Sequence, residues 1–217
     1  MPHEKQPFQV YADRYDAWYD SPKGRALFAT EVRCLRLLLQ GFQKPYLEVG
    51  VGTGRFAHAL GIECGVDPSP QAIETAQRRG IKALLSVGES LPFADGSFGA
   101  VLLTFTLCFV QDPNKVLREI HRVLSKEGGL ALGLLPKGTP WADSYAERGA
   151  KGDPFYREAH FYSKEEVERV LRESGFRIAE YRSTLFQPPG LEVYSEEKPL
   201  DGYVPGAGFV AISAVRF

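Results

Sequence analysis

A cluster of glycines with an acidic residue in front of it is the stretch of the sequence most suited to bind a ligand. It comprises Glu48, Gly50, Gly52 and Gly54. Glycines let the backbone approach a ligand closely and adopt positive φ. A dinucleotide loop has the spacing Gly-x-Gly-x-x-Gly, but its last position holds Arg55 when counted from Gly50 and Ala57 when counted from Gly52. The spacing disfavours a dinucleotide, although alanine is tolerated there in some dinucleotide loops. The carboxylate of Glu48 would repel a phosphate and attract a cationic amino group or a sulfonium.

A second acidic residue, Asp67, ends a short apolar run and is followed by Pro68 and Ser69. At the end of a parallel strand, such a side chain can accept hydrogen bonds from both hydroxyls of a ribose. Asp67 could instead cap the helix that begins near Pro70, but Ser69 could fill that role equally well. Together, Glu48 and Asp67 indicate a nucleoside with a positively charged tail as the ligand.

The elements that must position these residues alternate between short apolar runs and helical patterns. The predicted strands are residues 46–49, 62–66, 81–85, 98–103 and 130–135, and the predicted helices between them are residues 56–60, 71–78 and 112–124. This alternation predicts an α/β fold with parallel strands joined by right-handed crossovers. Ser163 and Glu166 form a capping-box pattern that predicts a helix as far as Gly175. Residues 176–183 and 209–215 are predicted to be two closing strands.

Two segments outside this alternation are candidates for covering a ligand. Residues 11–40 are predicted to form two helices with a break at residues 21–24. The first helix carries aromatic residues at helical spacing, which could either form a lid that attracts a cation or pack as ordinary core. They are Tyr11, Tyr15, Trp18 and Tyr19. Residues 136–162 are longer than most connections, so we expect them to line a substrate pocket.

The composition argues against several classes of partner. A net charge of −1 over 217 residues provides no long-range field for nucleic acid, and the basic pairs on predicted helices are interpreted as solvated faces. Those pairs are Arg33 with Arg36, Arg78 with Arg79, and Arg118 with Arg122. Three widely spaced cysteines predict neither disulfides nor a metal site. Neither a signal peptide nor a stretch long enough to span a bilayer is apparent, so we expect a cytoplasmic protein, and the oligomeric state stays open.

Four blocks of the sequence, at matching spacing, resemble the class I S-adenosylmethionine-dependent methyltransferases of the methyltransferase domain 11 type, the branch that includes ubiquinone and menaquinone methyltransferases. The blocks are residues 48–54, 66–69, 88–98 and 112–129. The resemblance implies a Rossmann-like sheet of seven strands, mostly parallel, with helices on both faces and an antiparallel last strand. It also implies one domain with a helical lid (1–42), a cofactor-binding core (43–135), a substrate-side insertion (136–162) and a closing helix and strands (163–217).

The resemblance further implies which residues bind S-adenosylmethionine and its product S-adenosylhomocysteine. They are Glu48, Gly50, Gly52 and Gly54 around the methionine part, Asp67 and Pro68 at the ribose, Gly88, Glu89, Ser90 and Leu91 at the adenine, and Thr104 beneath the sulfonium. Val87 stands where family members often carry an aspartate. The adenine amino group would therefore rely on backbone carbonyls or on Glu89.

Methyl transfer from a sulfonium needs alignment and exclusion of water more than it needs catalytic groups. An alcohol or amine acceptor would also need a proton acceptor within hydrogen-bond reach. Four residues are candidates: His160, Tyr162, Asp16 and Cys108. We take His160 and Tyr162 as the candidate catalytic residues, although His160 is equally expected as a surface residue and Cys108 is better explained by packing.

The predicted function is transfer of a methyl group to a small-molecule acceptor, with no nucleic acid and no metal involved. Whether oxygen, nitrogen or carbon is methylated stays open. A catalytically silent binding module of the same fold is one alternative. A dinucleotide-dependent oxidoreductase is a second, weaker one, since Glu48 and the later blocks count against it.

Overall fold

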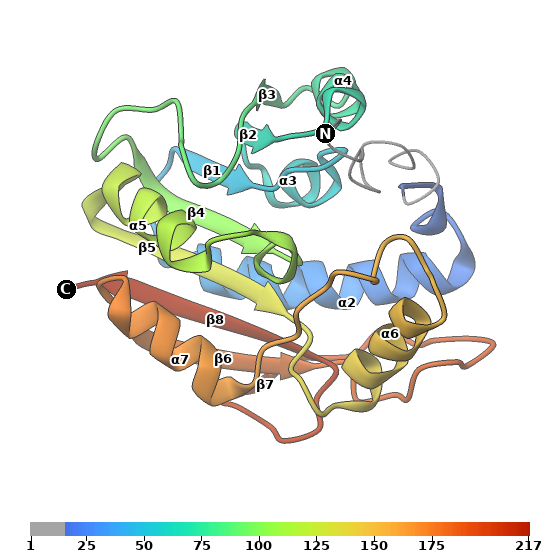
Figure 1. Cartoon of the computed structure of the whole chain (residues 1–217). Helices are drawn as coiled ribbons and strands as arrows, with labels where there is room; N and C mark the ends of the chain where they lie inside the picture. The colour runs from blue at the N-terminus through green and yellow to red at the C-terminus, as the bar shows by residue number, and fades with distance from the viewer. Residues whose placement is uncertain (1–15) are drawn as a thin grey trace.

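The computed structural model describes residues 16–217, in which eight strands form one sheet. Their spatial order is β3-β2-β1-β4-β5-β8-β6-β7 (Figure 1). The strands are β1 (Tyr46–Val49), β2 (Cys64–Asp67), β3 (Lys82–Leu85), β4 (Phe98–Thr104), β5 (Leu124–Leu134), β6 (Phe176–Thr184), β7 (Leu200–Asp201) and β8 (Phe209–Arg216). The first five are parallel, and β8 is inserted antiparallel between β5 and β6. The Rossmann-like, mostly parallel sheet with an antiparallel last strand is confirmed.

The predicted count of seven strands is wrong by one, because a two-residue strand, β7, pairs with the edge strand β6. Two residues in a loop rich in proline and glycine show no hydrophobic alternation, so the sequence carries no signal for this strand. In contrast, β1 and β4 are buried along their whole length, as strands covered on both faces must be.

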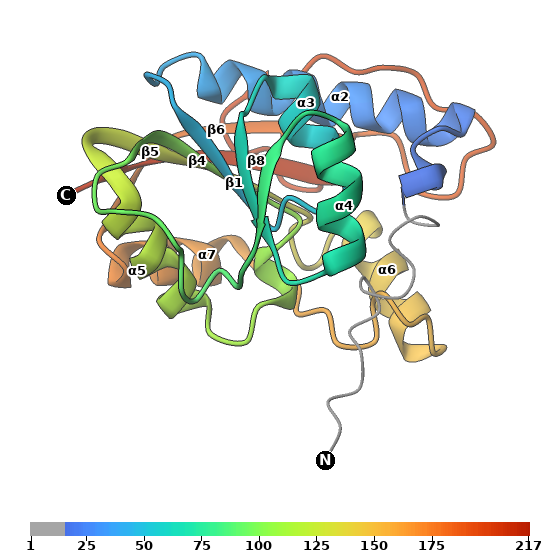
Figure 2. The same cartoon turned by 90° about the horizontal axis from the view of Figure 1, so that it is seen from above.

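Helices cover both faces of the sheet (Figure 2). The apolar side chains of α2 (Pro22–Leu39), α3 (Arg55–Leu60) and α4 (Pro70–Arg78) join one core, and those of α5 (Pro113–Val123) and α7 (Lys164–Glu173) join a second. Side chains of β4 alternate between the two cores: Ala100 and Leu102 face the first, and Val101 and Leu103 face the second. This alternation follows from the two-residue period of a strand.

A polar cap followed by proline starts four helices: α2, α4, α5 and α6 (Pro140–Ala150). Ser21, Ser69, Asp112 and Thr139 each accept a hydrogen bond from a backbone N–H in the first helical turn, and a proline follows each of them. Such caps satisfy N–H groups that would otherwise lack a partner. The capping box predicted at Ser163 and Glu166 is present.

Two segments differ from the sequence-based expectation. The predicted break at residues 21–24 lies partly inside α2, which begins at Pro22. Gly24 is buried in its first turn, so close to the backbone of Trp18 that any side chain at this position would collide with it. Residues 136–162 were expected to be irregular, but they contain α6 (Pro140–Ala150). The arrowheads of β1, β4 and β5 point toward the end of the molecule where α6 lies (Figure 1).

Candidate functional site

The three glycines of the loop between β1 and α3 all have positive φ, but their surroundings differ. A side chain at Gly50 would collide with Thr106, and one at Gly54 would press against Ala76 of α4. At Gly52, the added Cβ would have no atom of the described chain within 4 Å. Gly50 and Gly54 therefore allow close packing, whereas Gly52 borders open space in which a ligand can approach the backbone.

Glu48 is buried in β1 directly before this loop. It is only 2% exposed, and its Oε2 has no hydrogen-bond partner among residues 16–217. Burial raises the pKa of Glu48 well above its ordinary value; a backbone hydrogen bond from Ala57 opposes this effect, and the nearby charge of Asp67 adds to it. A buried carboxyl oxygen without a partner is costly, and a cationic group at this position would remove the cost.

Asp67 lies at the end of β2 and is joined to the glycine loop. One carboxylate oxygen accepts a hydrogen bond from the backbone N–H of Gly52 at 2.9 Å, and the other accepts one from the N–H of Ser69 at 2.9 Å. Ser69, not Asp67, caps α4. Burial raises the pKa of Asp67, and the two backbone hydrogen bonds oppose the shift. The alternative role of Asp67 as a helix cap is thus excluded.

The loop that carries Gly88, Glu89, Ser90 and Leu91 is held against α5. The carboxylate of Glu119 accepts a hydrogen bond from the backbone N–H of Leu91 at 2.7 Å and pairs with Arg122 at 2.8 Å. Arg122 donates to the carbonyl oxygens of Leu91 and Phe93, and also pairs with Asp95. The interpretation of Arg122 as part of a solvated helix face is therefore wrong. Glu119 is its neighbour on the helix, but Leu91, Phe93 and Asp95 come from a distant part of the sequence, which a helical charge pattern cannot reveal.

Asp16 ties the start of the described chain to the glycine loop. Its carboxylate pairs with Arg55 at 2.7 Å and with Arg79 at 2.6 Å, and it accepts a hydrogen bond from the hydroxyl of Thr53. Burial alone would raise the pKa of Asp16, but these hydrogen bonds outweigh it and lower the pKa to about 2. Asp16 is therefore a poor proton acceptor, and the interpretation of Arg79 as a solvated residue is wrong. Asp20 adds a second contact to Arg55 at 2.8 Å.

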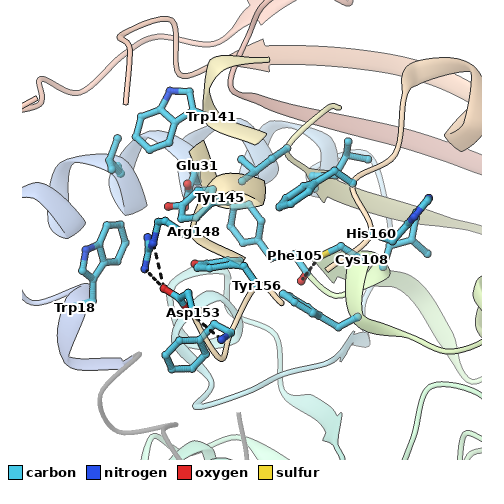
Figure 3. Close-up of a pocket in the computed structure, with 18 of the residues that line it drawn as sticks. Trp18, Glu31, Phe105, Cys108, Trp141, Tyr145, Arg148, Asp153, Tyr156 and His160 are labelled. Carbon is cyan, nitrogen blue, oxygen red and sulfur yellow. Dashed lines mark hydrogen bonds and ion pairs between the residues drawn. The ribbon is translucent and has the colours of Figure 1, made fainter. Parts of the chain in front are cut away.

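A cavity of about 470 Å³ opens beside the carboxyl ends of β4 and β5 (Figure 3). It is lined by residues 17–31, by the strand ends at residues 105–109 and 133–135, by residues 141–162, and by Leu185. Aromatic side chains form a large part of its wall, as is typical of small-molecule sites. They include Trp18, Tyr19, Phe105, Trp141, Tyr145 and Tyr156. The expectation that residues 136–162 line a pocket is met.

Two of the four aromatic residues of the predicted lid, Trp18 and Tyr19, belong to the described residues. Tyr11 and Tyr15 lie outside the described residues. Tyr19 is buried and packs edge-on against Phe28 and Phe56, at ring distances of 5.4 and 6.1 Å, while Trp18 is exposed at the mouth of the cavity. Tyr19 thus belongs to the core as well as to the cavity wall.

Phe105 and Leu185 are the two non-glycine residues of the described chain with positive φ, at 54° and 58°. Both line the cavity. Bulky side chains rarely adopt this conformation, and strained residues concentrate at binding and catalytic sites. Phe105 follows Thr104, whose hydroxyl oxygen is buried without a hydrogen-bond partner among residues 16–217. The end of β4 is therefore the most strained part of the cavity wall.

His160 and Cys108 lie together at one end of the cavity (Figure 3), and Tyr162 also lines the cavity. The backbone N–H of His160 donates to the carbonyl of Cys108 at 2.9 Å, and the His160 ring packs edge-on against Tyr162 at 4.5 Å. His160 is exposed at the rim. Burial raises the pKa of the Cys108 thiol to about 12 and also raises the pKa of Tyr162. Cys108 is therefore a protonated packing residue, not a nucleophile.

Glu31 of α2 is a site residue that the sequence analysis missed. Its side chain lines the opposite end of the cavity, beside Tyr145 (Figure 3). It is 6% exposed, and its Oε2 has no hydrogen-bond partner within residues 16–217. Burial raises the pKa of Glu31 to about 8. A glutamate on a charged helix surface is expected to be solvated, so no local pattern marks it.

Neither a metal centre nor a membrane span is found in the described part of the chain. Residues 16–217 contain no group of three or more histidine, cysteine, aspartate or glutamate side chains arranged to bind a metal ion. No helix among them is long and apolar enough to cross a bilayer.

Comparison with known proteins places this site in context. The sequence model of a methyltransferase domain matches residues 47–132. An S-adenosylmethionine-dependent methyltransferase of Thermotoga maritima, a possible histamine N-methyltransferase, superposes with a TM-score of 0.88; it is 34% identical, and the match covers 96% of this chain and 97% of that one.

Two relatives known from sequence extend the comparison. An uncharacterized protein of Mycobacterium bovis is 54% identical over 99% of this chain and 76% of its own length. The demethylmenaquinone methyltransferase of Thermotoga maritima is 34% identical, with a match that covers 49% of this chain and 51% of the enzyme.

Proposed function

Because the chain belongs to the S-adenosylmethionine-dependent methyltransferases, we propose that it transfers the methyl group of this cofactor to a small molecule held in the cavity. The buried Oε2 of Glu48, which has no hydrogen-bond partner among residues 16–217 and lies directly before an open glycine loop, carries the proposal. A cationic amino group is a partner that suits this oxygen, whereas a phosphate would be repelled.

The residues at the carboxyl edge of the sheet suit the rest of the cofactor. Asp67 retains free lone pairs on both carboxylate oxygens after its two backbone contacts, so it can accept hydrogen bonds from ribose hydroxyls. Gly88 lies within packing distance of Val49, which brings the proposed adenine loop to the end of β1. Pro68, Glu89, Ser90 and Leu91 complete this side of the proposed site, and Thr104 lies at its border with the cavity.

When bound, the cofactor supplies a methyl group on a positively charged sulfur, which is already activated for in-line displacement. The chain then has to align the acceptor and exclude water. The aromatic wall excludes water, and the strained Phe105 lies beside Thr104 at the proposed junction of the two sites. His160 and Tyr162 are proposed to accept a proton from an alcohol or amine acceptor.

The proposed division of the domain follows from this arrangement. Residues 17–31 and 141–162 both contribute to the wall of the cavity, so the segments 1–42 and 136–162 are proposed as acceptor-side elements around the core formed by residues 43–135. Residues 163–217 close the sheet with α7, β6 and β8.

Calorimetry with S-adenosylmethionine, S-adenosylhomocysteine and nicotinamide dinucleotides tests the proposal. We expect the first two to bind and the dinucleotides not to bind; tight dinucleotide binding without S-adenosylmethionine binding would overturn it. The variant E48Q should weaken S-adenosylmethionine binding at least about tenfold, because it removes the charge but keeps the shape. Its matched control, E127Q, replaces an exposed glutamate at the other end of β5 and should not change the affinity.

Transfer itself is tested separately with cofactor labelled in its methyl group. Labelled product with any compound of a small-molecule acceptor set supports the proposal. Cofactor binding without transfer to any acceptor would favour the catalytically silent binding module.

A further inference from the structure

The burial of the Glu31 side chain is not explained by the proposed cofactor site. This side chain lies in the wall of the cavity, almost completely buried, and its Oε2 has no hydrogen-bond partner in the described chain. Buried polar groups are nearly always paired, and an unpaired buried carboxylate is destabilising. The expected explanation for such a group is a partner that is present only when a ligand is bound.

The neighbouring side chains do not neutralise this carboxyl. Arg148 lines the same cavity, but its guanidinium is paired with Asp153 at 2.7 and 3.1 Å. It also lies over the rings of Tyr145 and Tyr156, at 5.3 and 4.9 Å from their centroids (Figure 3). The Arg148–Asp153 pair is electrically neutral as a unit. An ionised Glu31 would therefore leave this end of the cavity with a net negative charge.

The remaining surroundings of Glu31 are aromatic. Tyr145 is close enough for the charge of Glu31 to contribute to its raised pKa, after the larger effect of burial. Trp141 packs near Tyr145 at a ring distance of 6.4 Å, and its indole N–H already donates to the carbonyl of Gln187 at 2.8 Å. The indole N–H of Trp141 is therefore already occupied and is not a free donor for a ligand. A carboxylate next to aromatic faces is a suitable environment for an organic ammonium group.

We propose that the cavity selects acceptors that carry a protonated amino group, and that Glu31 is the residue that binds this group. This inference rests on the proposed function, since it takes the cavity as the acceptor site. It concerns recognition only. A protonated nitrogen has no free lone pair, so the ammonium group is the part of the acceptor that is held, and a different atom of the same molecule accepts the methyl group.

The test compares ligands of equal size and different charge. Each primary amine of a panel, such as phenethylamine, histamine and hexylamine, is matched with the alcohol and the carboxylic acid of the same skeleton. Binding is measured by calorimetry with and without saturating S-adenosylhomocysteine. We expect at least one amine to bind about tenfold or more tightly than its matched alcohol, and the acids not to bind. If no amine binds more tightly than its alcohol, the inference is wrong, and this result needs no variant.

The variant E31Q then assigns the preference to Glu31. It should weaken amine binding about thirtyfold or more, because one partner of a buried charge pair is lost, and should leave alcohol binding within about twofold. It should not lower the melting temperature of the free protein, since it removes an unpaired carboxyl. The control E127Q should change neither quantity. An amine affinity that is the same in E31Q as in the wild type would overturn the role of Glu31.

The two proposals fail in different ways. Loss of S-adenosylmethionine binding in the wild type would contradict the proposed function, whatever amines do. Normal cofactor binding without any preference for amines would contradict only the inference about Glu31.

Discussion

Replacing Asp16 with asparagine should detach the start of the described chain from the glycine loop. The carboxylate is only 13% exposed and is bound by Arg55, Arg79 and Thr53. These hydrogen bonds outweigh the opposing effect of burial and lower the pKa from 3.8 to about 2. A shift of nearly two units corresponds to roughly 2.5 kcal/mol. Since both arginines are partly exposed and can turn to solvent in the variant, we expect D16N to lower the free energy of unfolding by about 2 kcal/mol at pH 7.

The pH dependence of this effect has a defined direction. The folded-state pKa of Asp16 lies below the unfolded-state value, so the stabilisation is complete above about pH 4 and is lost as the pH falls from about 4 to about 2. Urea denaturation of wild type and D16N across this range measures it. The difference between the two proteins should narrow as the pH falls.

Asp20 provides the matched control for this experiment. Its side chain is 66% exposed and it pairs only with Arg55 among the contacts described, at 2.8 Å. An exposed pair of this kind contributes little, so D20N should change stability by less than about 1 kcal/mol. Equal losses of stability in D16N and D20N, or a loss in D16N that is independent of pH, would refute the inference that the contacts of Asp16 fix the chain to the glycine loop.

Three further variants test other parts of the site. The stability of E31Q relative to the wild type should rise by roughly 2–4 kcal/mol between about pH 4.5 and about pH 8, because burial raises the folded-state pKa of Glu31 to about 8, so that over this range the unfolded wild type ionises while the folded wild type keeps its proton; thermal unfolding between pH 5 and pH 9 measures this, and a constant difference would contradict it. D67A should lower the free energy of unfolding by about 1–3 kcal/mol, because it leaves two backbone N–H groups without an acceptor. It should also weaken S-adenosylhomocysteine binding about tenfold or more in calorimetry, and an unchanged affinity would contradict the proposed role of Asp67 at the ribose. H160A should keep cofactor affinity within about twofold and, with an acceptor that needs deprotonation, lower kcat about 10²-fold or more; an unchanged kcat would exclude His160 as the base.

The order of the strands along the chain and the loop that carries the predicted cofactor residues could be predicted because their determinants are local. The glycine spacing and the acidic residues before the loop and at the end of β2 belong to short segments whose strand character is evident from apolar runs. Once neighbouring strands are parallel, their carboxyl ends must meet at one edge of the sheet. The contact between Asp67 and the N–H of Gly52 is a direct outcome of that geometry.

The segment of residues 136–162 was less predictable because its local pattern is weak. The helix α6 contains Gly149 and no valine, isoleucine or leucine, so no aliphatic stripe marks it in the sequence. Thr139 followed by Pro140 is a local signal that could have revealed it, since this pair has the form of a helix cap and first residue. The structure shows that residues 141–162 line a cavity, and that they bind a substrate stays a prediction.

The environment of charged side chains was the feature least predictable from the sequence. A sequence pattern treats a charge on a helix as solvated, yet Arg79 reaches Asp16, Arg122 holds the loop before β4, and Glu31 is buried against a cavity. Asp16 and the loop before β4 lie far from Arg79 and Arg122 along the chain, and the segments that bury Glu31 are equally distant.

The sequence by itself determined the class of fold, the ligand-binding edge of the sheet and the chemical character of the cofactor loop, because these depend on periodicity and on neighbouring residues. Only the tertiary structure decided which charges are buried, which are paired and what shape the acceptor cavity has. The environment of a charge is set by all the segments that pack around it. For Glu31 and Glu48, that environment, and not the residue type, leaves a buried carboxyl oxygen without a hydrogen-bond partner, which is the basis of the binding roles proposed for them.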